Sequence, residues 1–247
     1  MTSGNVGNME FIAIGVILAF GACVQGAIGF GLGMLAAPLI ALIAPDLLPG
    51  AVLLLAFALS FATFIRERGE IHWSVVGWVS LGRVPGSLLG AWLVTILPTA
   101  GLSLVLAVSV VLGVVVSLVG WSPGYGRRSA GIAGLAAGVL GTSTSIGGPP
   151  LALILRGLSP SVVRGTMGAA FVVGTALSIV ALWVGGSLGM EQWRASFIFL
   201  PAVVVGFLLS GLVNRYVNSQ HLYAGSVVLS LIGAAVVIAS SIRGLLG

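Results

Sequence analysis

The chain is a succession of long apolar segments separated by short polar stretches. The segments are rich in Leu, Val, Ala and Gly, and they lack the alternation of polar and apolar residues that is typical of membrane β-barrels. A membrane-spanning helix needs about 20 apolar residues. The segments that reach or approach this length run over 9–44, 50–65, 74–97, 99–120, 130–156, 163–184, 193–213 and 222–242. The pattern therefore predicts an all-α integral membrane protein.

Two of these segments carry an interruption. Segment 130–156 contains LGTSTSIGGPPLALIL, in which four hydroxyl residues precede Gly-Gly-Pro-Pro. Glycine lowers helix propensity, and proline lacks the N–H donor but suits the first turn of a new helix. Segment 9–44 is longer than one span and contains the glycine-rich QGAIGFGLG. We therefore expect helix, break and helix in both segments.

A broken helix at membrane depth exposes unpaired N–H groups. Such a backbone is tolerated only where it faces protein or a water-filled cavity. The N-terminus of the second helix also favours an anion, because its N–H groups and the helix dipole point at the ligand. We interpret the two breaks as the two halves of one transport site.

The two halves of the chain share landmarks in the same order. At an offset of 112 residues, Gly29 falls on Gly141 and Pro38 falls on Pro150, and later landmarks align at offsets of 116 and 120. Repeats of this kind are common in transporters. The predicted parts are a first transmembrane repeat over 1–121, a linker over 122–129 and a second transmembrane repeat over 130–247.

The topology depends on whether the broken segments cross the membrane. If they do, the halves are parallel and nine of the arginines divide six against three; if they are re-entrant hairpins, the halves are inverted and the division is seven against two. The inverted arrangement fits the positive-inside rule better, and it places the N-terminus outside. It also brings the breaks together near the midplane, where inverted-repeat transporters bind substrate. The seven residues that would share a side are Arg66, Arg68, Arg127, Arg128, Arg156, Arg164 and Arg215.

Composition narrows the function. The chain is 58% hydrophobic and 6% charged, against about 25% charged residues in soluble domains. Its net charge of +5 comes from ten scattered arginines and no lysine, so no basic patch indicates nucleic acid as a partner. The five acids lie near segment ends, and the spans hold no cluster for metal binding or acid–base catalysis. We expect no enzyme activity, no cofactor and no metal; the lipid bilayer is a partner, and a homodimer is left open.

Three motifs resemble the sulfite exporter TauE/SafE family, also called the organosulfur or toluene-sulfonate permease family. They are GAIGFGLGMLAAPL at 26–39, GVLGTSTSIGGPPL at 138–151 and RGTMGA at 164–169. The resemblance implies a carrier of the bacterial-type inner membrane that moves sulfite, sulfonates such as sulfoacetate, or related small anions. In the alignment of the two halves, Ser143 and Ser145 fall on Gly31 and Gly33, a departure that leaves the exact cargo open.

Arg83 lies near the middle of a predicted span. A charge at the bilayer centre costs roughly 2.5–3.5 kcal/mol on insertion scales. A planar guanidinium binds a sulfonate in bidentate fashion, so we expect Arg83 to contact the anion. The alternative is a structural strut that pairs with a buried carbonyl or carboxylate.

The other candidates lie in or beside the breaks. The hydroxyls can donate to sulfonate oxygens or cap the broken helix, and the glycines can admit backbone donors or serve helix packing. Two further arginines bracket the loop after the second break, either at the mouth of the site or as solvated interfacial residues. The predicted substrate-binding residues besides Arg83 are Gln25, Gly29, Gly31, Gly33, Thr142, Ser143, Thr144, Ser145, Gly147 and Gly148, and the mouth residues are Arg156 and Arg164.

These features together predict an exporter of small sulfur-containing anions that works by alternating access. An inside-negative potential drives each negative charge outward by roughly 2.3 kcal/mol per 100 mV. The alternatives are an anion channel and a transporter of a non-sulfur small organic anion.

Overall fold

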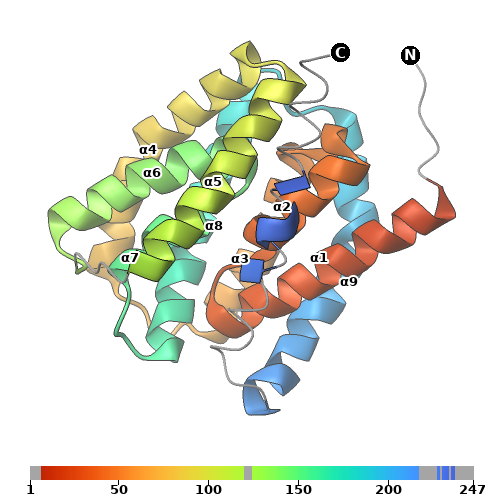
Figure 1. The fold of residues 1–247 in the computed structure, drawn as a ribbon. Helices are drawn as coiled ribbons and strands as arrows, with labels where there is room; N and C mark the ends of the chain where they lie inside the picture. The colour runs from red at the N-terminus through yellow and green to blue at the C-terminus, as the bar shows by residue number, and fades with distance from the viewer. Residues whose placement is uncertain (1–6, 120–123, 217–226, 229, 234, 237–247) are drawn as a thin grey trace.

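The computed structural model describes residues 7–119, 124–216, 227–228, 230–233 and 235–236. Within these residues the secondary structure is entirely helical, as predicted (Figure 1). The elements are α1 (Asn8–Ile28), α2 (Leu32–Ile43), the 3-10 helix η1 (Pro45–Leu47), α3 (Gly50–Arg66), α4 (Trp73–Ile96), α5 (Thr99–Val119), α6 (Arg127–Thr144), α7 (Gly148–Ile154), α8 (Pro160–Val184) and α9 (Met190–Tyr216). Among the described helices, α1, α4, α8 and α9 are long and apolar enough to cross a membrane. The predicted span 222–242 lies mostly outside the described residues.

Both predicted helix breaks are present. Helix α1 is followed by Gly29, which has the left-handed φ of 97°, and helix α6 is followed by Ser145, with φ of 65°. These two left-handed residues are 116 residues apart, which is four residues, or about one helical turn, more than the offset of 112 that places Gly29 on Gly141. Glycines that serve helix packing recur every four residues, and an alignment of them can therefore slide by one turn.

Helix α2 folds back along α1. Leu32, its first residue, lies against Gly21, where an added Cβ would be 3.3 Å from the Leu32 Cα atom. One apolar cluster then joins Leu18 of α1 to Ala36 of α2. Helices α1 and α2 therefore form a hairpin whose tip is the first break.

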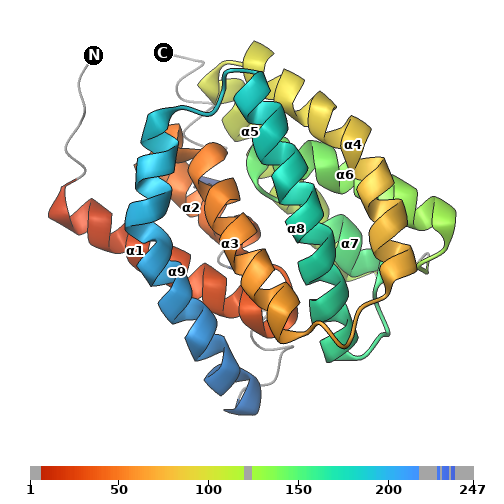
Figure 2. The ribbon, with the colours of Figure 1, turned by 180° about the vertical axis from the view of Figure 1, so that it is seen from behind.

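The most extensive helix contacts are α4 with α6 and α1 with α9, and both pairs lie side by side in Figures 1 and 2. Glycines make these contacts close: Gly134 packs on Val79 and Gly138 packs on Gly86. The residue numbers rise together in the two helices, from Val79 and Gly134 to Gly86 and Gly138, so α4 and α6 run in the same direction.

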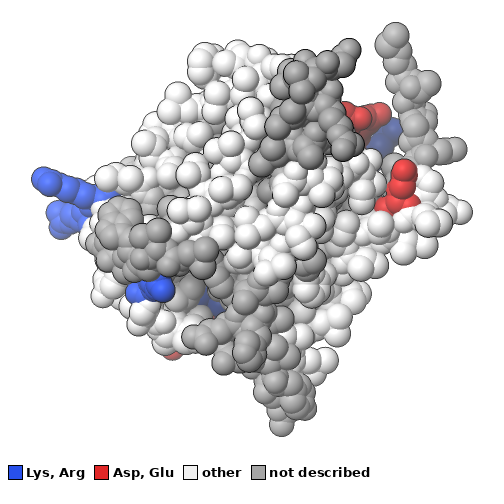
Figure 3. Space-filling view, viewed as in Figure 1, with Lys and Arg blue, Asp and Glu red and all other residues white. Residues whose placement is uncertain are grey.

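The charged residues separate toward two ends of the molecule (Figure 3). The backbone N–H of His72 donates to Thr166, and the His72 ring lies 5.4 Å from the Tyr125 ring. These contacts bring the end of α3 and the starts of α4, α6 and α8 to one end, which we call the arginine-rich end. At the opposite, acidic end, the Gln192 side chain of α9 donates to the carbonyl of Asp46. The arginine-rich end carries Arg66, Arg68, Arg127, Arg128, Arg156 and Arg164.

Candidate functional site

The two helix breaks meet inside the protein. A Cβ atom added at Gly33 would overlap the carbonyl oxygen of Ser145, and one added at Gly148 would lie 2.7 Å from the ring of Phe30. Only glycine permits this approach, because any side chain would push the two broken segments apart. Residues that are more than a hundred positions apart in the sequence thus share one site.

A cavity of about 30 Å³ lies between the breaks. A cavity needs roughly 10–15 Å³ by this measure to hold one water, so the space suits one or two waters or, with small adjustments, a compact ion. Seven of the eleven predicted substrate-binding residues line it. They are Gln25, Gly31, Gly33, Arg83, Ser145, Gly147 and Gly148.

Arg83 reaches the cavity from the middle of α4 and is only 1% exposed. Its Nη2 donates to the carbonyl of Ala137 at 3.2 Å, and its guanidinium lies 5.7 Å from the centre of the Phe171 ring. In the described part of the chain, Nε and Nη1 have no hydrogen-bond partner. The residues that line the cavity include no carboxylate. A buried cation without a counter-ion is expensive, and an anion in the cavity would supply both the charge and the acceptors.

Glycines hold the guanidinium in place. A Cβ added at Gly174 of α8 would fall onto the Arg83 guanidinium, and one added at Gly141 would lie 2.7 Å from its Nη2. Gly147, at the second break, is next to the same nitrogen. The arginine therefore fills a slot between three helices, which restricts its orientation toward the cavity.

The four hydroxyl residues of the second break differ in position. Ser143 and Thr144 donate to the carbonyls four residues earlier, at 2.7 and 2.6 Å, and Thr142 bonds to Ser178 at 2.7 Å. Among the four, Ser145 is the one that lines the cavity. Ligand contact by the other three stays a prediction, and the observed bonds are those of the capping and back-bonding alternative.

Ser145 also marks the boundary toward the acidic end. It is the one non-glycine residue with positive φ in the described chain, a conformation that side chains disfavour and that is found at functional sites. Its hydroxyl donates to the carbonyl of Pro49 at 3.1 Å. Pro49 lines a second cavity of about 370 Å³, together with Asp46 and Glu191. One hydrogen-bonded layer thus lies between the inner cavity and this vestibule.

Gln25 supports the first break. Its side-chain oxygen accepts a hydrogen bond from the backbone N–H of Leu32 at 3.2 Å, which satisfies a free donor at the start of α2. Its nitrogen approaches the Ser60 hydroxyl at 3.4 Å. Gln25 therefore acts both as a cap for α2 and as a wall of the cavity.

The remaining candidates lie at the arginine-rich end. Gly29 is packed against the backbone of Arg164, and the Arg164 Nε donates to Glu67 at 2.8 Å. Arg156 is exposed. The structure thus places Arg164 beside the first break, while Arg156 lies on the surface.

The sequence did not predict the other cavity residues, which include two aromatic and two hydroxyl side chains: Phe30, Ser60, Phe171 and Thr175. Ser60 is a polar residue inside an apolar segment, and Thr175 lies four positions after Phe171 on one face of α8. A search for isolated hydroxyls within spans would have found both polar residues.

The comparisons with known proteins agree with the resemblance. The model of the family described as sulfite exporter TauE/SafE matches residues 13–237. Neither the curated proteins nor the solved structures gave a match.

Proposed function

This chain belongs to the sulfite exporter TauE/SafE family, and we propose that it exports a small sulfur-containing anion by alternating access. Its family is one of membrane transporters. The proposed cargo class is sulfite or an organosulfonate such as sulfoacetate, and the proposed binding site is the cavity between the two breaks.

One observation carries the proposal: Arg83 is fully buried, has two donors without a partner in the described chain, and lies beside a cavity lined by no carboxylate. Nε and Nη1 lie on different edges of the planar guanidinium, each beside Nη2, and such an edge is suited to two oxygens of one anion. The glycines of both breaks surround the same space, so backbone donors can complete the site.

The proposal includes inverted repeats. The directions of α1 and α6 support inverted repeats. Helix α1 runs from the acidic end toward Arg66, whereas α6 starts at the arginine-rich end and runs toward the acidic end. The offset of 116 residues that relates the breaks also relates Pro85 in α4 to Pro201 in α9. Two halves of opposite direction around one cavity would allow access to alternate between the two sides.

The orientation follows from the same arrangement. Under the positive-inside rule, the arginine-rich end faces the cytoplasm, and the N-terminus and the vestibule with Asp46 and Glu191 face outward. We propose the bacterial-type inner membrane as the location. The homodimer stays a prediction.

The test is transport by the purified protein in liposomes. A carrier takes up labelled sulfite or sulfoacetate with saturation, and unlabelled anion on the opposite side accelerates the uptake. Liposomes with the Arg83→Met variant, reconstituted at the same protein density, are the control. Flux that stays linear with concentration and shows no counterflow would support an anion channel, and no flux with any of these anions would refute the cargo class.

A further inference from the structure

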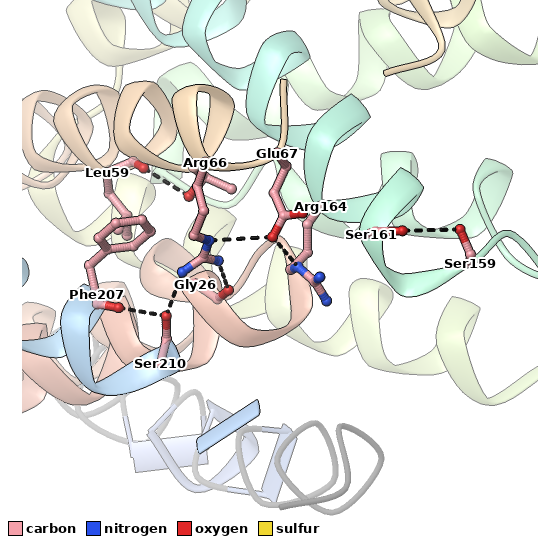
Figure 4. A network of polar contacts seen from close by, with 10 residues as sticks. Gly26, Leu59, Arg66, Glu67, Ser159, Ser161, Arg164, Phe207 and Ser210 are labelled. Carbon is pink, nitrogen blue, oxygen red and sulfur yellow. Dashed lines mark hydrogen bonds and ion pairs between the residues drawn. The ribbon is translucent and has the colours of Figure 1, made fainter. Parts of the chain in front are cut away.

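A second cluster of arginines lies at the arginine-rich end, where the first break approaches the surface. Arg66 ends α3, Glu67 follows it, and Arg164 lies in the second turn of α8. Figure 4 shows the two guanidinium groups directed toward one carboxylate. The Glu67 Oε1 accepts a hydrogen bond from the Arg164 Nε at 2.8 Å and lies 3.3 Å from the Arg66 Nε.

This cluster has one anionic group for two cations. Its side chains are neither deeply buried nor free: the exposed fractions are 28% for Arg66, 13% for Glu67 and 16% for Arg164. A dissolved anion can therefore reach the cluster, and partial burial strengthens its attraction to the pair of guanidinium groups.

The cluster is connected to the cavity through the last turn of α1. The Arg66 Nη2 donates to the carbonyl of Gly26, and the Arg66 Nη1 donates to the Ser210 hydroxyl of α9 at 3.0 Å. The guanidinium also lies 4.5 Å from the centre of the Phe207 ring. Gln25, the residue before Gly26, lines the cavity. Arg66 is therefore hydrogen-bonded to the residue that follows a cavity-lining residue in the last turn of α1.

We propose that Arg66 and Arg164 form a second anion site, an entry site, in which Glu67 is a tethered carboxylate that a cargo oxyanion replaces. While Glu67 is bound, the cluster ties α1, α3, α8 and α9 together at this end. An arriving oxyanion takes over the two arginines and releases Glu67, which removes the direct contact between Glu67 at the end of α3 and Arg164 of α8 beside the first break. The transport role of this site rests on the proposed function, but the existence of the site does not.

The experiment measures sulfate binding to purified protein by calorimetry at low ionic strength. All variants carry Arg83→Met, so the inner cavity contact is removed and the entry site is measured alone. Glu67→Gln in this background is expected to bind sulfate at least tenfold more tightly than the background does. The matched control is Glu70→Gln, which removes the same charge from an exposed residue of the same loop, and it is expected to bind like the background. Adding Arg164→Gln to the Glu67→Gln protein is expected to abolish the gain.

Equal sulfate binding by the Glu67→Gln and Glu70→Gln proteins would overturn the entry site, and so would a gain that persists without Arg164. If Glu67→Gln does not fold, Glu67→Asp takes its place, because the shorter carboxylate withdraws from the arginines without a change of charge. The Glu67→Asp protein is expected to bind sulfate more tightly than the background, and an unchanged sulfate affinity would overturn the proposal. Absence of liposome transport by the unmodified protein would leave these binding outcomes unaffected, so the two proposals fail separately.

Discussion

Replacement of Arg83 by methionine separates a binding role from a structural one. Methionine keeps most of the side-chain length and apolar contact but removes the charge and the donors. In the described structure the arginine makes one hydrogen bond, to Ala137, and leaves two donors for a ligand. The carbonyl of Ala137 keeps its partner within α6, because helical carbonyls accept from the residue four positions later.

The size of the effect on binding follows from the two free donors. Hydrogen bonds to charged groups contribute about 1.5–3 kcal/mol each, so two of them give roughly 3–6 kcal/mol. At about 1.4 kcal/mol per factor of ten, affinity for the anion is expected to fall between ~100-fold and ~10,000-fold.

The effect on stability has the opposite sign. Removing a buried cation that lacks a counter-ion relieves a desolvation cost, and such replacements are often neutral or stabilising. The anion-free Arg83→Met protein is therefore expected to melt at or above the temperature of the unmodified protein.

Both quantities come from one assay, thermal unfolding of detergent-purified protein with and without sulfite or sulfoacetate, with affinities taken from the concentration dependence of the shift. Binding within threefold of the unmodified protein would refute the contact between Arg83 and the anion. In a chain of this size, a loss of 1 kcal/mol in the free energy of unfolding lowers the melting temperature by roughly 2–4 °C. A fall of more than about 5 °C in the anion-free variant would therefore assign the arginine a structural role.

Three further substitutions test the site. Gly174→Ala places a Cβ on the cavity arginine, whereas the added Cβ of the control, Gly77→Ala, meets nothing within 4 Å. Because both substitutions gain similar helix propensity, calorimetry is expected to show a tenfold loss of anion affinity in Gly174→Ala alone. Equal affinities of the two variants would contradict the packing argument. Gly33→Ala collides with the Ser145 carbonyl, so it is expected to lower the melting temperature and the folded yield in size-exclusion chromatography, and an unchanged profile would show that the breaks are not in contact. Ser143→Ala removes a hydroxyl that bonds within its own helix, so its anion affinity is expected within threefold of the unmodified protein, and a tenfold loss would place that hydroxyl at the ligand.

The local structure follows from short stretches of sequence. Apolar length predicted the helices, and Gly-Gly-Pro-Pro predicted the second break, where α7 starts at Gly148. These outcomes depend on neighbouring residues, because helix propensity and the missing N–H of proline act within one turn. Arg83 was also identifiable, since a charge within a span is rare whatever surrounds it.

Which side chains share the cavity depends on how the helices pack. Residue periodicity shows that Phe171 and Thr175 lie on one face of α8, but only the packing of α8 against α4 turns that face toward Arg83. In the same way, four adjacent hydroxyl residues are equivalent in sequence, and of these four the structure places only Ser145, at the left-handed turn, in the lining of the cavity. The pairing of Glu67 with Arg164 joins residues almost a hundred positions apart. Such contacts depend on how separate helices pack, and no local pattern encodes that packing.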